Sequence, residues 1–243
     1  MIWIIGGTSE TRELLKKFSD ENIEDYIVTV VSEEGLLQIP EYRNKAVIRK
    51  MNFEEMKKFI DEEKISTAVD MSHPFAKEVS RNAKKAAEER EISYIRFIRD
   101  EADVSNCRNF ENIETLKEYL SEIEGTVFFT TGSKDIGEFE SVRGNNRFVY
   151  RILPAQYGID ICRENNIALK DIVAVLGPFS KDFNKAFFEN YKADYAVMKN
   201  SGNSGGTQEK IDACLELGIE PLVLKRDREE GTGSIDEILE MIL

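Results

Sequence analysis

Short apolar runs alternate with longer amphipathic stretches along the whole chain. In the first half these runs predict strands at Ile2–Ile5, Tyr26–Val31, Ala46–Arg49, Thr67–Met71 and Tyr94–Phe97. A second series predicts strands at Thr126–Thr131, Arg147–Arg151, Ile172–Leu176, Tyr195–Met198 and Leu222–Leu224. Nearly continuous apolar runs such as IWII are typical of strands buried on both faces. The alternation therefore predicts an α/β fold with mainly parallel sheets flanked by helices.

The stretches between the strands repeat apolar residues at helical spacing. Phe75, Val79, Ala83 and Ala86 lie on one face of a helix that we expect to begin near Pro74, because proline is favoured at the first helical position. The same spacing predicts a last helix with an apolar face formed by Ile235, Ile238, Leu239 and Ile242.

The two series of strands predict two α/β domains. We place them at residues 1–124 and 125–243, with the boundary near Glu124. The pattern leaves room for a strand or a terminal helix that crosses from one domain to the other.

Composition limits the classes of partner. The formal net charge of −13 repels nucleic-acid phosphates and anionic lipid, which leaves small molecules or proteins. No apolar run approaches the roughly 20 residues that span a bilayer, and the start MIWIIGG lacks the features of a signal peptide. We therefore expect a cytoplasmic protein that binds neither nucleic acid nor membrane. The sequence leaves the oligomeric state open.

Three cysteines, Cys107, Cys162 and Cys214, stand far apart and form no CxxC pair. Their odd number and spacing suggest neither a disulfide framework nor a zinc site. We expect packing roles for all three and no metal site.

A glycine-rich turn follows the first predicted strand. Gly6, Gly7, Thr8, Ser9 and Glu10 provide close backbone approach, hydroxyl groups and the free N–H groups of a helix start, which suit a pyrophosphate. A purely structural turn is the alternative.

The end of the second predicted strand is where a ribose 2′-hydroxyl is usually bound. Ser32 would tolerate a 2′-phosphate, whereas Glu33 would favour the unphosphorylated cofactor. The choice between NADPH and NADH therefore stays open.

Two similar loops occur in the second half. One has Thr131, Gly132 and Ser133 after a strand, and the other begins with Lys199, Asn200, Ser201 and Gly202. Lysine, amide, hydroxyl and glycine together form an anion-binding nest, for which a flexible polar loop is the alternative. Nests in both halves suggest a ligand held between the domains.

His73 is the only histidine and directly precedes Pro74. It either caps the start of a helix or donates a proton or a hydrogen bond to a substrate carboxylate, because imidazole titrates near neutral pH. Asp70 is a candidate for orienting it.

Five segments, each after a predicted strand and in the same order, resemble the precorrin-6A reductase family over nearly the full length. They are IIGGTSETREL at 4–14, DMSHPFAKEVSRNA at 70–83, FFTTGSKDIGEF at 128–139, VLGPFS at 175–180 and KNSGNSGGTQEKIDA at 199–213. Asn203 departs from the family, which usually has glycine there. The resemblance implies two Rossmann-like domains with a ligand cleft between them. It also implies an oxidoreductase of corrin (cobalamin) biosynthesis, with NADPH or NADH as cofactor. The reaction would reduce one C=C bond of precorrin-6A or cobalt-precorrin-6A to the 6B form.

The resemblance also implies roles for residues. The cofactor would be bound by Gly6, Gly7, Thr8, Ser9, Glu10, Thr131, Gly132, Ser133, Lys199, Asn200, Ser201 and Gly202, and the macrocycle lined by His73, Pro74 and Phe75. Ser180 of VLGPFS is a further substrate candidate. The anionic tetrapyrrole calls for cations near strand ends, for which the candidates are Arg96, Arg99, Lys134, Arg151, Lys181 and Lys199.

Two alternatives remain. A dinucleotide-sensing or tetrapyrrole-carrier protein would share the fold without catalysing a reaction. A short-chain dehydrogenase would use a Tyr-x-x-x-Lys pair such as Tyr195 and Lys199, but that pair works on a helix, and this segment is predicted to be a strand, where the side chains lie roughly 13 Å apart.

Overall fold

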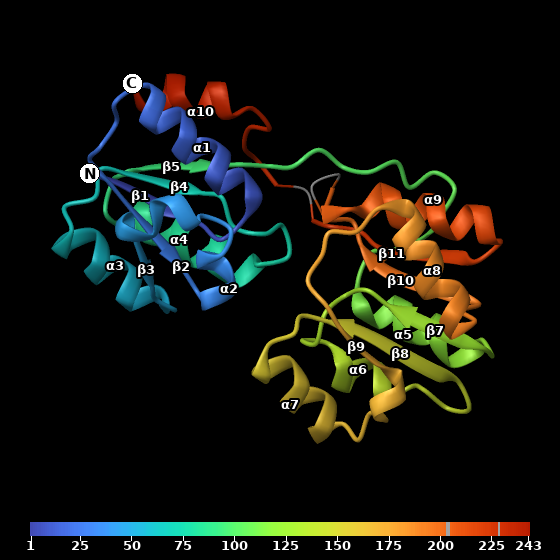
Figure 1. The fold of residues 1–243 in the computed structure, drawn as a ribbon. Coiled ribbons are helices and arrows are strands. Elements are labelled where there is room, and N and C mark those ends of the chain that lie inside the picture. The colour runs from blue at the N-terminus through green and yellow to red at the C-terminus, as the bar shows by residue number, and fades with distance from the viewer. Residues whose placement is uncertain (203–204, 228) are drawn as a thin grey trace. The chain divides into compact units, whose positions relative to one another are not determined.

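Parallel strands form two sheets in the computed structural model of the chain (Figure 1). The structure describes residues 1–202, 205–227 and 229–243. Contacts divide the chain into a first unit, Met1–Arg99 with Arg228–Leu243, and a second unit, Asp100–Asp227. Asn203, the expected departure from the family pattern, lies outside the described residues.

The sheet of the first unit has the order β3-β2-β1-β4-β5, and each neighbouring pair is parallel. Its strands are β1 (Ile2–Ile5), β2 (Tyr26–Val30), β3 (Ala46–Ile48), β4 (Thr67–Asp70) and β5 (Ser93–Arg96). Its helices are α1 (Ser9–Asp20), α2 (Glu33–Leu36), the 3₁₀ helix η1 (Pro40–Lys45), α3 (Phe53–Glu62), α4 (Lys77–Glu89) and α10 (Ile235–Ile242).

Alternate residues of β1 enter cores on opposite faces of this sheet. Ile4 packs into a core with residues of α1 and α10, whereas Trp3 and Ile5 pack into a core with residues of α3 and α4. Because both faces are covered, a strand needs apolar side chains at every position, which explains the continuous run IWII.

The sheet of the second unit has the order β6-β11-β10-β7-β8-β9 and is also parallel throughout. Its strands are β6 (Arg108–Phe110), β7 (Thr126–Phe129), β8 (Arg147–Ile152), β9 (Ile172–Ala174), β10 (Tyr195–Lys199) and β11 (Glu220–Leu224). Its helices are α5 (Ile113–Glu122), α6 (Ile136–Glu140), α7 (Gln156–Glu164), the 3₁₀ helix η2 (Leu169–Asp171), α8 (Lys181–Tyr191) and α9 (Thr207–Leu217). Residues of α5, α6 and α7 pack on one face of the sheet, and residues of α8 and α9 on the other.

All ten predicted strands are present, with ends shifted by a few residues. The pattern missed β6, because three residues, two of them polar and exposed, leave no apolar signal. The predicted start of α4 near Pro74 is wrong: the helix begins at Lys77, and Pro74 and Phe75 form a turn in which Ala76 N donates to His73 O at 2.8 Å.

The division into units differs from the boundary expected near Glu124. Residues 100–124 belong to the second unit because β6 pairs with β11 and α5 packs on the same sheet. The C-terminal helix α10 returns to the first unit, where Ile235, Ile238 and Leu239 enter the core beside α1.

The returning C-terminal segment is fixed at the end of β5. Thr232 N donates to Arg96 O at 2.9 Å, and Ile98 N donates to Thr232 O at 2.8 Å. A Cβ atom at Gly231 would lie 2.2 Å from Arg96 O, so only glycine allows this close approach.

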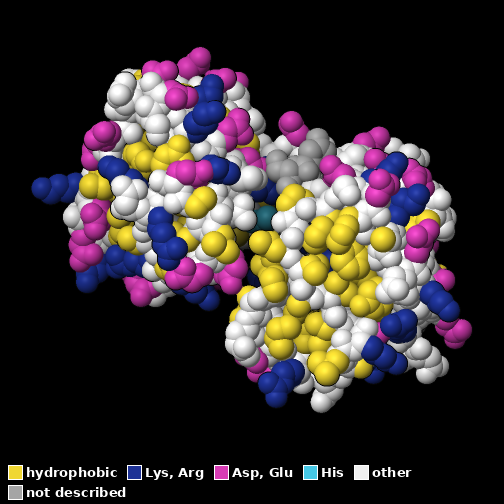
Figure 2. Space-filling model, in the orientation of Figure 1, with side chains coloured by type: hydrophobic (Ala, Val, Ile, Leu, Met, Phe, Trp, Pro, Cys, Tyr) yellow, Lys and Arg dark blue, Asp and Glu magenta, His cyan; other side chains and the backbone are white. Residues whose placement is uncertain are grey.

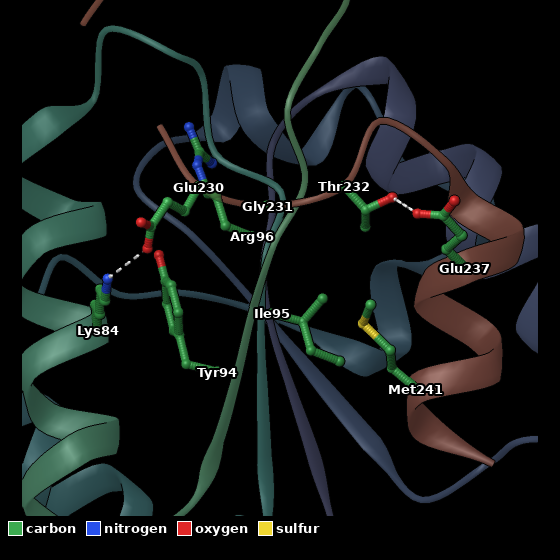
Figure 3. Close-up of a pocket in the computed structure, with 9 residues that line it drawn as sticks. All are labelled: Lys84, Tyr94, Ile95, Arg96, Glu230, Gly231, Thr232, Glu237 and Met241. Atoms are coloured by element: carbon green, nitrogen blue, oxygen red, sulfur yellow. Dashed lines mark hydrogen bonds and ion pairs between the residues drawn. The ribbon is translucent and has the colours of Figure 1, made fainter. Parts of the chain in front are cut away.

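A buried ion pair lies beside this segment. Arg96 Nη1 is 3.1 Å from Asp70 Oδ1, with side-chain exposures of 4% and 0%, and Arg96 Nε donates to Glu229 Oε2 at 2.9 Å. Tyr94 Oη donates to Asp70 Oδ2 at 2.7 Å, and burial together with the Asp70 charge raises the pKa of Tyr94. Arg96 and Tyr94 also line a pocket of about 370 Å³ between α4, β5 and α10 (Figure 3).

Replacing Arg96 with methionine should lower the free energy of unfolding by about 3–5 kcal/mol, because Asp70 would keep its burial and lose its counter-charge. Urea denaturation measures the loss. Arg90→Met is the matched control in the same unit, since Arg90 pairs with Asp61 at the exposed surface and should lose no more than about 1 kcal/mol. Equal losses in the two variants would contradict the structural role of the Asp70–Arg96 pair.

Candidate active site

The strand order of the first unit reverses between β1 and β4, which is where open parallel sheets bind ligands. The loops after these strands are adjacent: Met71 N donates to Ile5 O at 2.9 Å, and Thr8 Oγ1 donates to Met71 O at 3.0 Å. The structure therefore brings the Gly6-Gly7-Thr8 turn next to the loop that carries Ser72 and His73.

The glycine-rich turn leads directly into α1. Gly7 has a φ of +108°, and Thr8 caps the helix: its Oγ1 accepts from Thr11 N at 3.3 Å, while its own N–H donates to Thr11 Oγ1. A Cβ atom at Gly6 would lie 2.8 Å from Thr11 Cγ2 and 2.9 Å from Val28 Cγ1. Gly6 is therefore required for packing, and the Thr8 hydroxyl serves the helix cap.

Glu10 and Arg99, both sequence candidates, bind each other. Arg99 Nη2 donates to Glu10 Oε2 at 2.7 Å, and the two side chains are 9% and 7% exposed. Ser9 Oγ donates to the same carboxylate at 2.9 Å. The pair neutralises two of the charges that the sequence places at this edge of the sheet.

Ser32 lies at the start of α2 and is partly buried. A hydrogen bond from its side chain, followed by the Glu34 backbone N–H, lowers the pKa of Glu34. Ser32 lies just after β2, where the sequence predicts binding of the cofactor ribose. Glu33 and Glu34 lie in the first turn of α2.

His73 is exposed and belongs to a turn rather than to a helix cap. Its Nδ1 accepts a hydrogen bond from Phe75 N at 3.2 Å, and the two rings are 6.0 Å apart. The N-cap of α4 is Ala76, so the expected capping role of His73 is wrong for the helix. Pro74 is buried and Phe75 partly buried.

Asp70, proposed to orient His73, has its oxygens engaged elsewhere. Oδ1 accepts from Ser72 N at 2.9 Å and from Arg96, and Oδ2 accepts from Tyr94. Arg96 also donates to Ser72 O at 2.9 Å. These contacts fix the backbone that immediately precedes His73.

The strand order of the second unit reverses between β7 and β10. Thr130 N donates to Val197 O at 2.8 Å, and Lys199 Nζ lies 2.9 Å from Asp135 Oδ2. The loop with Thr131, Gly132 and Ser133 is thus adjacent to the loop that begins at Lys199, as in the first unit.

The loop after β10 is held by its own polar groups. Asn200 is buried, and its Oδ1 accepts from Ala102 N at 3.2 Å. Ser201 N donates to Thr207 Oγ1 at 3.2 Å, and Gly202 has a φ of +76°. Asn200 therefore fixes the loop, whereas Lys199 shares its charge with Asp135.

Thr131 differs from its neighbour Thr130. Thr130 Oγ1 donates to Val197 O at 3.0 Å, whereas Thr131 Oγ1 is buried and has no hydrogen-bond partner among the described residues. Gly132, with a φ of +79°, follows, and a Cβ atom there would meet open space. A buried hydroxyl without a partner beside open space is suited to a polar ligand group.

The predicted substrate cations fall into two groups. Arg96, Arg99, Lys181 and Lys199 pair with carboxylates of Asp70, Glu10, Glu216 and Asp135, respectively. Arg151 instead donates from Nη1 to the amide Oδ1 of Asn184 at 2.8 Å, and burial lowers its pKa to about 10. Lys134 is exposed. Ser180 caps α8, where its Oγ accepts from Phe183 N at 3.3 Å.

Sequence reasoning missed Asp135 and Lys210. Asp135 lies inside the segment FFTTGSKDIGEF, and its position four residues after Thr131 could have indicated a place in the same loop. Lys210 gave no signal, because a lysine in a polar helix start is usually solvated.

Among the described residues no group of three His, Cys, Asp or Glu side chains is arranged to hold a metal ion, and no helix is long and apolar enough to cross a membrane.

Comparison with known proteins identifies the family. The family model of precorrin-6x reductase CbiJ/CobK matches residues 1–243. This chain belongs to the precorrin-6x reductase family. The resemblance found at the five loop segments is thereby confirmed.

Individual relatives agree with this assignment. The chain is 33% identical over 242 residues to the cobalt-precorrin-6A reductase of Priestia megaterium, covering 96% of this chain and 93% of that protein. It is 31% identical over 244 residues to the cobalt-precorrin-6A reductase of Salmonella typhimurium, covering 98% and 91%. The precorrin-6A reductase of Sinorhizobium sp is 27% identical over 251 residues, covering 99% and 92%.

The solved structure of CobK precorrin-6A reductase superposes with a TM-score of 0.78 at 19% identity, covering 99% of this chain and 95% of that one. The α/β fold with parallel sheets flanked by helices is confirmed. Tyr195 and Lys199 lie at the two ends of β10, so they cannot form the helical pair of a short-chain dehydrogenase.

The two threonines give a test of the orphan hydroxyl. Thr130→Val should lower the free energy of unfolding by about 1 kcal/mol, because it removes a hydrogen bond to Val197 O. Thr131→Val should leave the unfolding free energy within about 0.5 kcal/mol of the parent or raise it, because it removes a desolvated hydroxyl. Chemical denaturation of both variants measures this, and a loss at Thr131 equal to that at Thr130 would show that its hydroxyl is already bonded.

Proposed function

We propose that this chain reduces one C=C bond of precorrin-6A or cobalt-precorrin-6A to the 6B form, with NADPH or NADH as the hydride donor, in cobalamin biosynthesis in the cytoplasm. The observation that carries the proposal is the family match over residues 1–243, which includes every loop at the two points of strand-order reversal. Relatives named for precorrin-6A and for cobalt-precorrin-6A both match, so the proposal covers both.

The chain has features that fit a dinucleotide. The orphan Thr131 hydroxyl, the open space at Gly132 and the Lys199 ammonium lie in adjacent loops of the second unit. In the first unit the turn at Gly7 leads into the start of α1, and the N-terminus of a helix favours an anion. The proposed cofactor residues are Gly6, Gly7, Thr8, Ser9, Glu10, Ser32, Thr131, Gly132, Ser133, Lys199, Asn200, Ser201 and Gly202. When bound, the nicotinamide would supply the hydride.

The roles within this set follow from their contacts. Lys199 and Thr131 can bind a ligand directly, because one is a partly exposed cation and the other an unused hydroxyl. Thr8, Glu10 and Asn200 are engaged in a helix cap, an ion pair and a loop clamp, so their part is to hold the ligand-facing backbone in place.

The proposed substrate residues are His73, Pro74, Phe75, Arg96, Arg151 and Ser180. His73 is exposed, so its ring is able to donate a hydrogen bond or a proton to a ligand. Arg96 acts at a distance: it fixes Ser72 and so positions the turn that carries His73. Among the described residues no carboxylate oxygen lies within 4.0 Å of Arg151, so its charge suits a substrate carboxylate.

The decisive experiment mixes the purified full chain with precorrin-6A or cobalt-precorrin-6A and NADPH or NADH without oxygen. We expect loss of the reduced-nicotinamide absorbance together with formation of the 6B product, identified by mass. A chain that binds the nicotinamide and the tetrapyrrole without turnover would be a sensor or carrier, and the proposed reduction would then be wrong.

Replacing His73 with alanine separates its two roles. If the ring contacts the substrate, turnover should fall by about 10²-fold or more, the range of general acid–base catalysis. The free energy of unfolding should fall by less than about 1 kcal/mol, since the ring is exposed and its hydrogen bond from Phe75 N lies at the surface. Glu88→Ala, at an exposed residue of α4 in the same unit, is the matched control and should change neither turnover nor stability. A loss of stability with unchanged turnover would assign His73 to the turn alone.

A further inference from the structure

Two cations of the second unit, the partly buried Arg151 and the buried Lys210, have no carboxylate partner among the described residues. Arg151 lies near the carboxyl end of β8, and Lys210 lies in the first turn of α9, where it is 6% exposed. Within the described part of the chain, neither side chain has a carboxylate oxygen within 4.0 Å. Lys210 Nζ donates to Gly205 O at 3.2 Å, and Arg151 donates to Asn184.

The segment 177–180 joins the surroundings of both cations. The Arg151 guanidinium lies over the Phe179 ring, 5.2 Å from its centre, and Asn184 Nδ2 donates to Phe179 O at 3.1 Å. On the other side, a Cβ atom at Gly206 would lie 3.2 Å from Pro178 Cβ and 3.9 Å from Phe179 O. The start of α9 therefore packs on the same short segment as Arg151.

Electrostatics sets this pair apart from the other basic residues. Burial, followed by the positive charge of Arg151, lowers the pKa of Lys210 to about 7. On α9 itself Glu209 raises that pKa and Cys214 does so less, while Lys181 and Lys185 of α8 are paired with Glu216 at the surface. Arg151, Lys210 and the nearby Glu209 carboxylate form a cluster with a net positive charge that is largely shielded from water.

The Glu209 carboxylate does not hold either cation. Its Oε2 is buried and has no hydrogen-bond partner among the residues described, and it lies 3.7 Å from the Cβ position of Gly206. The surface next to the cluster is open to a ligand, since Pro178, Ser180 and Phe183 are exposed. Figure 2 shows apolar side chains gathered over one face of the second unit.

We propose that Arg151 and Lys210 form a subsite for an anionic oxygen group of a ligand, either a carboxylate or a phosphate. An anion there would offset two like charges that now repel each other and would gain the N–H groups at the start of α9. The existence of the subsite is independent of the proposed function, and only the source of the anion, a tetrapyrrole carboxylate or a nucleotide phosphate, rests on it.

Sulfate is the first probe, because its charge does not change between pH 6 and 9. Calorimetric titration of the full chain at constant ionic strength should show binding at pH 6 that weakens about tenfold or more at pH 9, as Lys210 loses its proton. Lys210→Met should abolish both the binding and its pH dependence. Lys170→Met is the matched control, an exposed lysine of the same unit that lies before β9, and should bind as the parent does.

A second measurement needs no variant. In protein with ¹³C-labelled lysine, one lysine should titrate near neutral pH, and sulfate should move its midpoint upward because the anion stabilises the ammonium form. An unmoved midpoint, or a Lys210→Met variant that binds sulfate as the parent does, would overturn the subsite.

The source of the anion is identified with two further probes, adenosine 2′,5′-bisphosphate and uroporphyrin, a stable tetrapyrrole polycarboxylate. Loss of tenfold or more in affinity for one of them in Lys210→Met, relative to Lys170→Met, assigns the subsite to that class of ligand. Unchanged affinity for both would overturn its role in ligand binding. Because none of these measurements requires turnover, a chain that fails to reduce precorrin-6A would leave their outcome intact.

Discussion

The reversal of strand order in each parallel sheet is the constraint on which the candidate site depends. Parallel pairing places every strand's carboxyl end at one edge, and the reversal separates the helices that follow two neighbouring strands onto opposite faces. In the first unit this occurs between β1 and β4, and in the second between β7 and β10. The loops that carry Gly7, His73, Thr131 and Lys199 are therefore next to a partner loop of the same unit because of topology, before any side chain contributes. The side-chain contacts from Thr8 to Met71 and from Lys199 to Asp135 then hold these loops in place.

The sequence was sufficient for ten of the eleven described strands and for the family, because both depend on local patterns. Runs such as IWII mark strands covered on both faces, and the loops that follow them carry the family's residues. The return of α10 to the first unit could not be predicted, since it depends on which of two similar apolar surfaces a short segment covers. The pairing of β6 with β11 could not be predicted because two of the three residues of β6 are polar and exposed. Pro74 illustrates a local signal that misled: proline also suits the turn that precedes a helix, and that is where it lies.

Charge is where sequence and structure differ most. Six cations near strand ends were candidates for an anionic substrate, but a cation at the edge of a sheet is also the natural partner of the many carboxylates in a chain with a net charge of −13. Four of the six have such a partner: Arg96, Arg99, Lys181 and Lys199. Asp70 and Arg96 are 26 residues apart in sequence, and Glu10 and Arg99 are 89 apart, so no local pattern could predict these pairs. Arg151, which is partly buried, and Lys210, which is buried, have no carboxylate partner among the described residues, and burial cannot be read from a polar helix start.

The buried pair of Asp70 and Arg96 links three parts of the first unit. Asp70 ends β4 and accepts a hydrogen bond from Ser72 N, so it sets the direction in which the chain leaves towards His73. Arg96 ends β5, binds Ser72 O and Glu229, and its carbonyl receives Thr232 N of the segment that leads to α10. A desolvated charge tolerates little displacement of its partner, because each lost contact leaves a buried charge uncompensated. The exposed His73 turn is consequently anchored by the same residues that fix the C-terminal helix, so a change at Glu229 or Gly231, far away in sequence, should alter the backbone that presents the histidine.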